Sequence, residues 1–267
     1  MEAELPPPVP PEPSRGVWSR ITPLFEGLGG EPTVILCGAS ALLIISHYQG
    51  AAGFFRTLVG NTLDQHPWNA TFGHFWWFGA SFFLYLVMPL LLALATRGSF
   101  NERYGFQLGD WRAGLLITAL FLAIMLPATY VASTLNTFKG IYPLAGNGAY
   151  LVNIGGGKTA ISWTLFLTYE AAYFAYFIAW EFLFRGWMVH GVVPKWGRGP
   201  AILAQMAPFA VMHLGKAELE ALGSIIAGVA LGILSLRTRS FYYGALIHGV
   251  VAVWMDWLSA KGSLLGP

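Results

Sequence analysis

Seven long apolar runs divide this chain of 267 residues, and they constrain its fold more than any other feature. A helix needs roughly 20 mostly apolar residues to cross the roughly 30 Å of hydrocarbon in a bilayer. The runs cover residues 33–48, 72–96, 113–133, 161–190, 200–214, 219–236 and 241–258. Hydrocarbon contains no water to form hydrogen bonds with backbone groups, so each span has to form them within a helix. The seven runs therefore predict an all-α, polytopic membrane helix bundle with about seven transmembrane helices. Weak apolar periodicity in 50–71 allows an eighth.

The composition also indicates a membrane protein. Hydrophobic residues make up 55% of the chain and charged residues only 10%, whereas a typical soluble domain carries about 25% charged residues. The net charge of +2 is too small to favour nucleic acid as a partner, so we expect a lipid environment and no nucleic acid. The single cysteine, Cys37, excludes a disulfide framework and a cysteine metal site, and we expect it to be buried.

The chain is predicted to divide into three parts. Residues 1–32 form a Pro-rich flexible tail and an interfacial segment, residues 33–100 form N-terminal transmembrane helices, and residues 101–267 form the core. The linker 134–160 is expected to be an irregular external loop. With seven spans, nine Lys and Arg residues fall on the side of the N-terminus and five on the other side, which predicts a cytoplasmic N-terminus.

Glu181 and Arg185 are the most unusual residues in the apolar runs. A charged side chain in hydrocarbon costs several kcal/mol, so such residues face inward, form pairs and mark functional sites. Their spacing of four places them on one face of a helix, where they can neutralise each other. His213 and His248 lie in apolar surroundings on later runs. The helical rise permits both histidines to meet Glu181 at one site near the middle of the membrane.

Two kinds of chemistry fit a glutamate and two histidines. Glu181 could act as a general base toward water, while one histidine stabilises the oxyanion and the other positions the water. Alternatively, Glu181, His213 and His248 could bind a divalent metal such as zinc, with the fourth position open to water.

Three further acids lie near these residues in the sequence. Glu170 precedes Glu181 by three helical turns on nearly the same face, and Asp256 follows His248 by eight residues. We expect both at the outer rim of a cavity, within reach of water. Glu220 could orient His213, although a solvated turn explains its position equally well.

The order of these motifs resembles the CPBP (Abi) family of intramembrane proteases, which includes the type II CAAX prenyl endopeptidases and bacteriocin-processing and self-immunity proteins. The resemblance covers roughly residues 100–258. Its motifs are Glu181-x-x-x-Arg185-Gly186, Phe209-x-x-x-His213 and His248, with Tyr142-Pro143-Leu144 and Leu231-Gly232-Ile233-Leu234 in support. The resemblance implies an intramembrane endopeptidase core in 101–267. It also implies a peptide or protein substrate, which could be prenylated, and a bacterial inner membrane.

Two positions depart from the family pattern. Family members usually carry Glu-Glu-x-x-x-Arg, in which the first glutamate activates water, and here Trp180 takes that place. The last motif usually reads His-x-x-x-Asn/Asp, and here the fourth position is Ala252. Two interpretations follow. Either Glu181 serves as the base, aided by Glu170, and the protein cleaves peptide bonds, or the protein is a non-catalytic member of the fold that binds or protects a partner.

Overall fold

The computed structural model describes residues 30–64, 66, 68–94, 100–146, 149–155 and 158–264. The N-terminal helices are α2 (Glu31–Gln49), α3 (Ala52–Val59), α4 (Asn69–Phe82), its π-helical continuation η2 (Phe83–Val87), α5 (Met88–Leu94) and α6 (Phe100–Arg103). The predicted tail and most of the interfacial segment lie outside the described residues.

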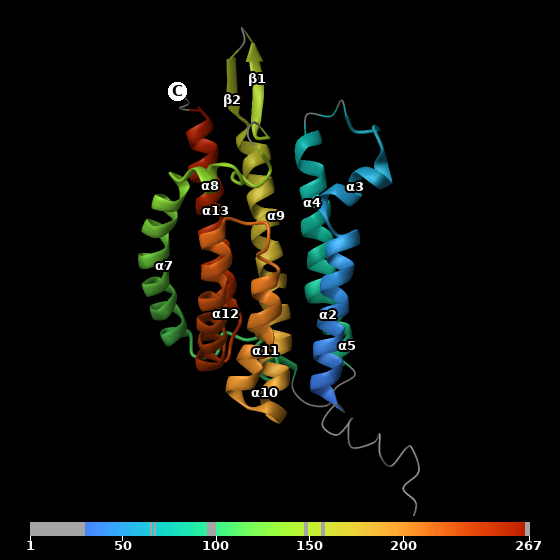
Figure 1. Ribbon diagram of the computed structural model, residues 1–267, viewed down its shortest axis with the longest axis vertical. Helices are drawn as coiled ribbons and strands as arrows, with labels where there is room; N and C mark the ends of the chain where they lie inside the picture. Colours follow the sequence, from blue (N-terminus) through green and yellow to red (C-terminus); the bar gives the residue numbers. More distant parts are fainter. Residues whose placement is uncertain are drawn as a thin grey trace, which may run out of the picture.

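The rest of the chain contains most of the bundle and a β-hairpin (Figure 1). Its elements are α7 (Trp111–Ser133), α8 (Asn136–Lys139), β1 (Leu151–Gly155), β2 (Lys158–Ile161), α9 (Trp163–Glu181), η3 (Phe182–His190), α10 (Gly191–Trp196), α11 (Arg198–Val211), α12 (Glu218–Thr238) and α13 (Tyr242–Leu264).

Four helices in the described ranges are long and apolar enough to cross a membrane: α2, Asn69–Ala93, α7 and α12. The predicted all-α membrane helix bundle is therefore confirmed, and the chain is an integral membrane protein. The individual spans differ from the prediction. α11 has 14 residues, or about 21 Å at the helical rise, which is too short to cross. α9 and α13 are long, but they are not among these four helices.

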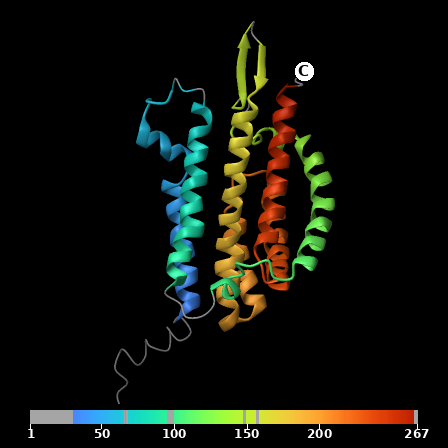
Figure 2. The same cartoon turned by 180° about the vertical axis from the view of Figure 1, so that it is seen from behind.

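The central helix of the bundle is α9. It packs against α4 on one side and against α13 on the other, and α7 lies beyond α13 (Figures 1 and 2). Ser162 caps α9 by accepting a hydrogen bond from the backbone N–H of Leu165 at 3.4 Å. η3 extends α9 in π-helical geometry, which is frequent at functional sites, and α11 packs against both η3 and α12.

The linker 134–160 is not the irregular loop that we predicted. It contains α8, and β1 pairs with β2 in an antiparallel hairpin that places Leu151 opposite Ile161. Apolar and β-branched residues on both sides of the glycines favour these strands, but the Gly-rich turn hides the signal. The hairpin projects past the helices where the C-terminus lies (Figure 1), and we call this side of the molecule the hairpin end.

Two smaller predictions are wrong. Cys37 on α2 is exposed on the surface of the bundle instead of buried. The weakly periodic segment 50–71 forms the helix α3 of only eight residues, which is too short for an eighth span.

Candidate functional site

A buried ion pair lies where α9 passes into η3. The Arg185 guanidinium donates to Glu181 Oε1 at 2.9 Å, and both side chains are 0% exposed. The guanidinium carbon also lies 4.0 Å from the centre of the Phe209 ring, a cation–π contact that offers the buried charge a second partner. The guanidinium therefore neutralises the carboxylate inside the bundle.

His248 joins this pair from α13. Its Nδ1 lies 2.9 Å from Glu181 Oε1, so one carboxylate oxygen accepts hydrogen bonds from both the arginine and the histidine. Because a carboxylate beside a guanidinium is an acceptor, Nδ1 of His248 carries the hydrogen of this bond. The His248 side chain is 20% exposed, whereas Glu181 is fully buried. His248 therefore lies between the buried ion pair and more accessible space.

His213 lies in the turn after α11, at the end of a helix held against η3. Its Nδ1 donates to the backbone oxygen of Phe209 at 2.7 Å, which leaves Nε2 as the acceptor. The rings of His213 and His248 are nearly parallel, at 14°, and their centres lie 6.1 Å apart. The structure therefore brings Glu181, Arg185 and both histidines together around Phe209.

A cavity of about 600 Å³ borders the histidines. Aromatic and aliphatic side chains from α7, α9, α12 and α13 form most of its wall, and both histidines line it. Trp180 and Ala252, the two departures from the family pattern, line it as well. Of the described residues that line this cavity, none is Glu181 or Arg185. The carboxylate therefore lies behind the cavity wall, with His248 between them.

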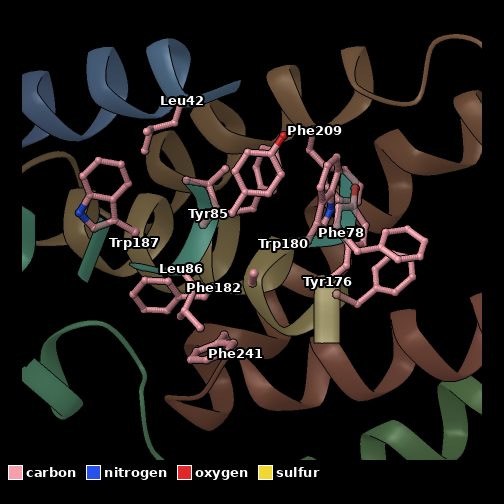
Figure 3. Packing of buried hydrophobic residues seen from close by; sticks show 14 of the residues in the cluster. Leu42, Phe78, Tyr85, Leu86, Tyr176, Trp180, Phe182, Trp187, Phe209 and Phe241 are labelled. Carbon is pink, nitrogen blue, oxygen red and sulfur yellow. The ribbon is translucent and has the colours of Figure 1, made fainter. Parts of the chain in front are cut away.

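Trp180 belongs to an aromatic cluster at the cavity wall (Figure 3). The centre of its ring system lies 6.0 Å from the Phe209 ring and 5.5 Å from the Tyr176 ring. It meets the His213 ring edge-on at 6.1 Å. The indole thus holds the histidine in place and presents an apolar surface to the cavity.

The three other acids do not join this site. Glu170 is 5% exposed and Asp256 is 0% exposed, so neither lies at a water-filled rim as predicted. Eleven residues of helix separate Glu170 from Glu181 by about 16 Å, too far for one to assist the other. The Glu220 carboxylate accepts from the Tyr142 hydroxyl at 2.8 and 2.9 Å, while His213 is oriented by the Phe209 carbonyl.

Tyr142, Lys216 and Glu220 instead form a polar cluster on the cavity wall at the hairpin end. The Lys216 ammonium donates to the Tyr142 hydroxyl at 3.2 Å and lies over its ring. Burial, and then the charge of Glu220, raise the pKa of Tyr142 well above its ordinary value, so its hydroxyl stays protonated and donates to Glu220. The cluster contains one positive and one negative charge.

The arrangement of donors does not favour the predicted zinc site. In the part of the chain that the structure describes, no three His, Cys, Asp or Glu side chains gather as a metal-binding group. The Arg185 guanidinium is paired with the carboxylate of Glu181. A metal ion bound to this carboxylate would have to displace the guanidinium. A carboxylate whose charge is already offset by a guanidinium attracts a metal cation less strongly.

Comparison with known proteins found one similarity, and it covers the residues of this site. Residues 159–254 match the family model described as type II CAAX prenyl endopeptidase Rce1-like. This stretch is similar to the Rce1-like family. The match supports the CPBP resemblance and includes Glu181, Arg185 and both histidines. Searches of curated proteins and of solved structures gave no match.

One residue beside the buried ion pair was missed in the sequence. Gly244 on α13 lies so close to Glu181 that a Cβ there would be 2.7 Å from Oε2. It precedes His248 by four residues, so both share a helical face, and this spacing was the available signal. The absence of a side chain at 244 lets α13 bring His248 onto the carboxylate.

Gly244→Ala is therefore expected to lower the thermal stability of the detergent-solubilised protein. Alanine within a helix normally stabilises it by up to about 1 kcal/mol relative to glycine, so a loss would report the close approach. Gly79→Ala on α4 is the matched control, because nothing lies within 4 Å of a Cβ there. Equal stabilisation of both variants would contradict the packing described for Gly244.

Proposed function

We propose that the protein binds an apolar chain, such as the prenyl chain of a CAAX-type peptide, in its cavity without hydrolysing the peptide. The observation that carries this proposal is the composition of the cavity wall. Trp180 and Ala252 line the cavity, and Glu181 does not. The family match supports a membrane-associated peptide as the partner.

The cavity has a suitable shape and lining for an apolar chain. Ligand pockets of roughly 300–1,000 Å³ with mostly apolar walls and a few polar groups are typical of small-molecule sites. Met125 on α7 and Ile226 on α12 line the cavity and are also 38% and 75% exposed on the surface of the bundle. The mouth therefore lies between α7 and α12, where a chain dissolved in the bilayer can enter.

The same residues argue against family-type hydrolysis. A general base must reach the water that it activates, within hydrogen-bond distance or through one intervening water. Glu181 has no exposed surface, and its Oε1 already accepts from Arg185 and His248. The indole of Trp180 is a donor only and cannot take a proton. Ala252 offers no hydrogen-bonding group to a developing oxyanion.

Peptide hydrolysis, our first interpretation from sequence, remains the second candidate function, and the histidine pair favours it. His213 and His248 both line the cavity, each with Nδ1 in a hydrogen bond within the protein, and a histidine can serve as a general base near neutral pH. In this mechanism Glu181 would orient His248 instead of touching water. His248→Ala should then abolish cleavage while Glu181→Gln weakens it.

Photocrosslinking in nanodiscs tests the binding proposal. A farnesylated CAAX peptide with a photoreactive prenyl chain is expected to label cavity residues, in competition with unlabelled peptide. Ala227→Trp should reduce the labelling at least about tenfold, because the indole fills the cavity that Ala227 lines. Leu116→Trp, at a surface position of α7 that is 62% exposed, is the control and should leave labelling unchanged. Labelling outside the cavity, or equal labelling in both variants, would contradict the proposal.

A further inference from the structure

We propose that Glu170 and Asp256 form a buried acid pair that holds one proton, carried by Glu170. The two residues lie on the neighbouring helices α9 and α13, nearer the hairpin end than the histidines. Among the described residues that line the cavity, neither appears, so this proton site is independent of the proposed binding function.

The two carboxyl groups differ in their hydrogen-bond partners. Asp256 Oδ1 accepts from the backbone N–H of Leu144 at 2.9 Å, and Oδ2 accepts from the Tyr150 hydroxyl at 3.3 Å. Both oxygens of Glu170 are buried and lack a hydrogen-bond partner in the described structure. Donors stabilise the ionised form of a carboxyl group, and burial without them favours the neutral form. Asp256 is therefore the carboxylate, and Glu170 is the acid.

The surroundings provide little positive charge to hold two carboxylates. The titratable groups close enough to interact electrostatically with the pair are Tyr142, Tyr150, Tyr169, Tyr173, Lys216 and Glu220. The ring of His74 packs against Tyr169. Lys216 is the one cation among these described groups, and Glu220 already attracts it. Burial raises the pKa of Tyr150, and Asp256 raises it further, so that hydroxyl keeps its proton and donates to Asp256.

A proton fits this place better than a metal ion. The oxygens of Glu170 are shielded from solvent, and no third acid or histidine joins the pair to complete a metal-binding group within the described ranges. A calcium ion takes six to eight oxygen ligands and needs the space to hold them. One proton neutralises Glu170 without occupying volume.

The proton would hold together three parts of the chain at the hairpin end. Asp256 joins α13 to the segment before the hairpin through Leu144 and Tyr150, and Glu170 lies on α9, which packs against α13. Loss of the proton would place two negative charges in a buried interface and separate these parts. Because the folded state holds a proton that the unfolded state releases above roughly pH 4, stability should fall as the pH rises.

Infrared difference spectroscopy of the full chain in nanodiscs tests the proposal. The wild-type protein at pH 7 is expected to show the C=O stretch of a protonated carboxylic acid, and Glu170→Gln should remove it. Glu218→Gln, at an exposed position on α12, is the control and should retain the band. A band absent from the wild type, or unchanged in Glu170→Gln, would overturn the assignment.

Unfolding measured against pH gives a second readout. One proton held only by the folded state makes the unfolding equilibrium constant rise about tenfold per pH unit until Glu170 ionises. Glu170→Gln, a neutral replacement of similar shape, should fold and should lose this contribution to the slope. Failure of Glu170→Gln to fold, or a slope equal to that of the wild type, would contradict a neutral Glu170.

Discussion

Arg185→Ala is expected to lower the free energy of unfolding by about 3–5 kcal/mol, the usual cost of removing one partner from a buried ion pair. The variant leaves the Glu181 carboxylate, 0% exposed, without its cation. It also removes the contact between the guanidinium and the Phe209 ring. Phe209 orients His213, so the loss should disturb the histidine pair as well. Denaturant unfolding in detergent micelles measures the effect.

Two variants make this expectation specific. Arg237→Ala removes an arginine from the ion pair with Asp110, whose side chains are 60% and 38% exposed, and should change stability little. The double variant Arg185→Met with Glu181→Gln removes both charges and should recover much of the stability that Arg185→Ala loses. Equal losses in Arg185→Ala and Arg237→Ala would show that the buried pair does not stabilise the bundle as described.

Gly114→Ala should have the second large effect, because it disrupts the crossing of α7 and α13. A Cβ at 114 would overlap the ring of Tyr243. The ring cannot move aside freely, since its hydroxyl donates to the Leu108 carbonyl at 2.7 Å. Overpacking of this kind costs about 1–3 kcal/mol.

Because α7 forms one wall of the cavity, Gly114→Ala should weaken prenyl-chain crosslinking together with stability. Gly223→Ala on α12 is the matched control for stability, as nothing lies within 4 Å of the added Cβ. Thermal unfolding of both variants in one detergent gives the comparison. An unchanged midpoint for Gly114→Ala would mean that α7 packs against α13 differently.

Much of the architecture followed from hydrophobicity and from the cost of buried charge. Apolar length identified α2, Asn69–Ala93, α7 and α12 as spans. The same reasoning singled out Glu181 and Arg185, because a charged pair in hydrocarbon has to face inward. The spacing of four residues then predicted the contact that the structure shows at 2.9 Å. These predictions depend on local sequence, where single-chain reasoning is strongest.

The features that could not be predicted from the sequence depend mostly on tertiary contacts. Glu170 and Asp256 were expected at a water-filled rim from their positions along the helices, and the packing of α9 and α13 under Tyr150 buries both. The direction of the Glu181 carboxylate, behind His248 and away from the cavity, depends on how α13 lies across η3. The hairpin β1–β2 was missed because each strand has only four or five residues and the strands flank a run of glycines, which are unfavourable in strands.

Position 180 shows how a family pattern and a structure answer different questions. The pattern marks Trp180 as a departure without saying what the indole does. The structure places it on the cavity wall, packed against Phe209 and edge-on to His213. A residue that cannot accept a proton therefore shapes the surface where the family pattern places a base.

The account is tested most directly by mass spectrometry of a farnesylated CAAX peptide incubated with the protein in nanodiscs. We expect the peptide to stay intact after prolonged incubation, while its photoreactive prenyl chain crosslinks to cavity residues of the same preparation. A shortened peptide that wild-type protein produces over many turnovers, and that His248→Ala fails to produce, would contradict binding without hydrolysis.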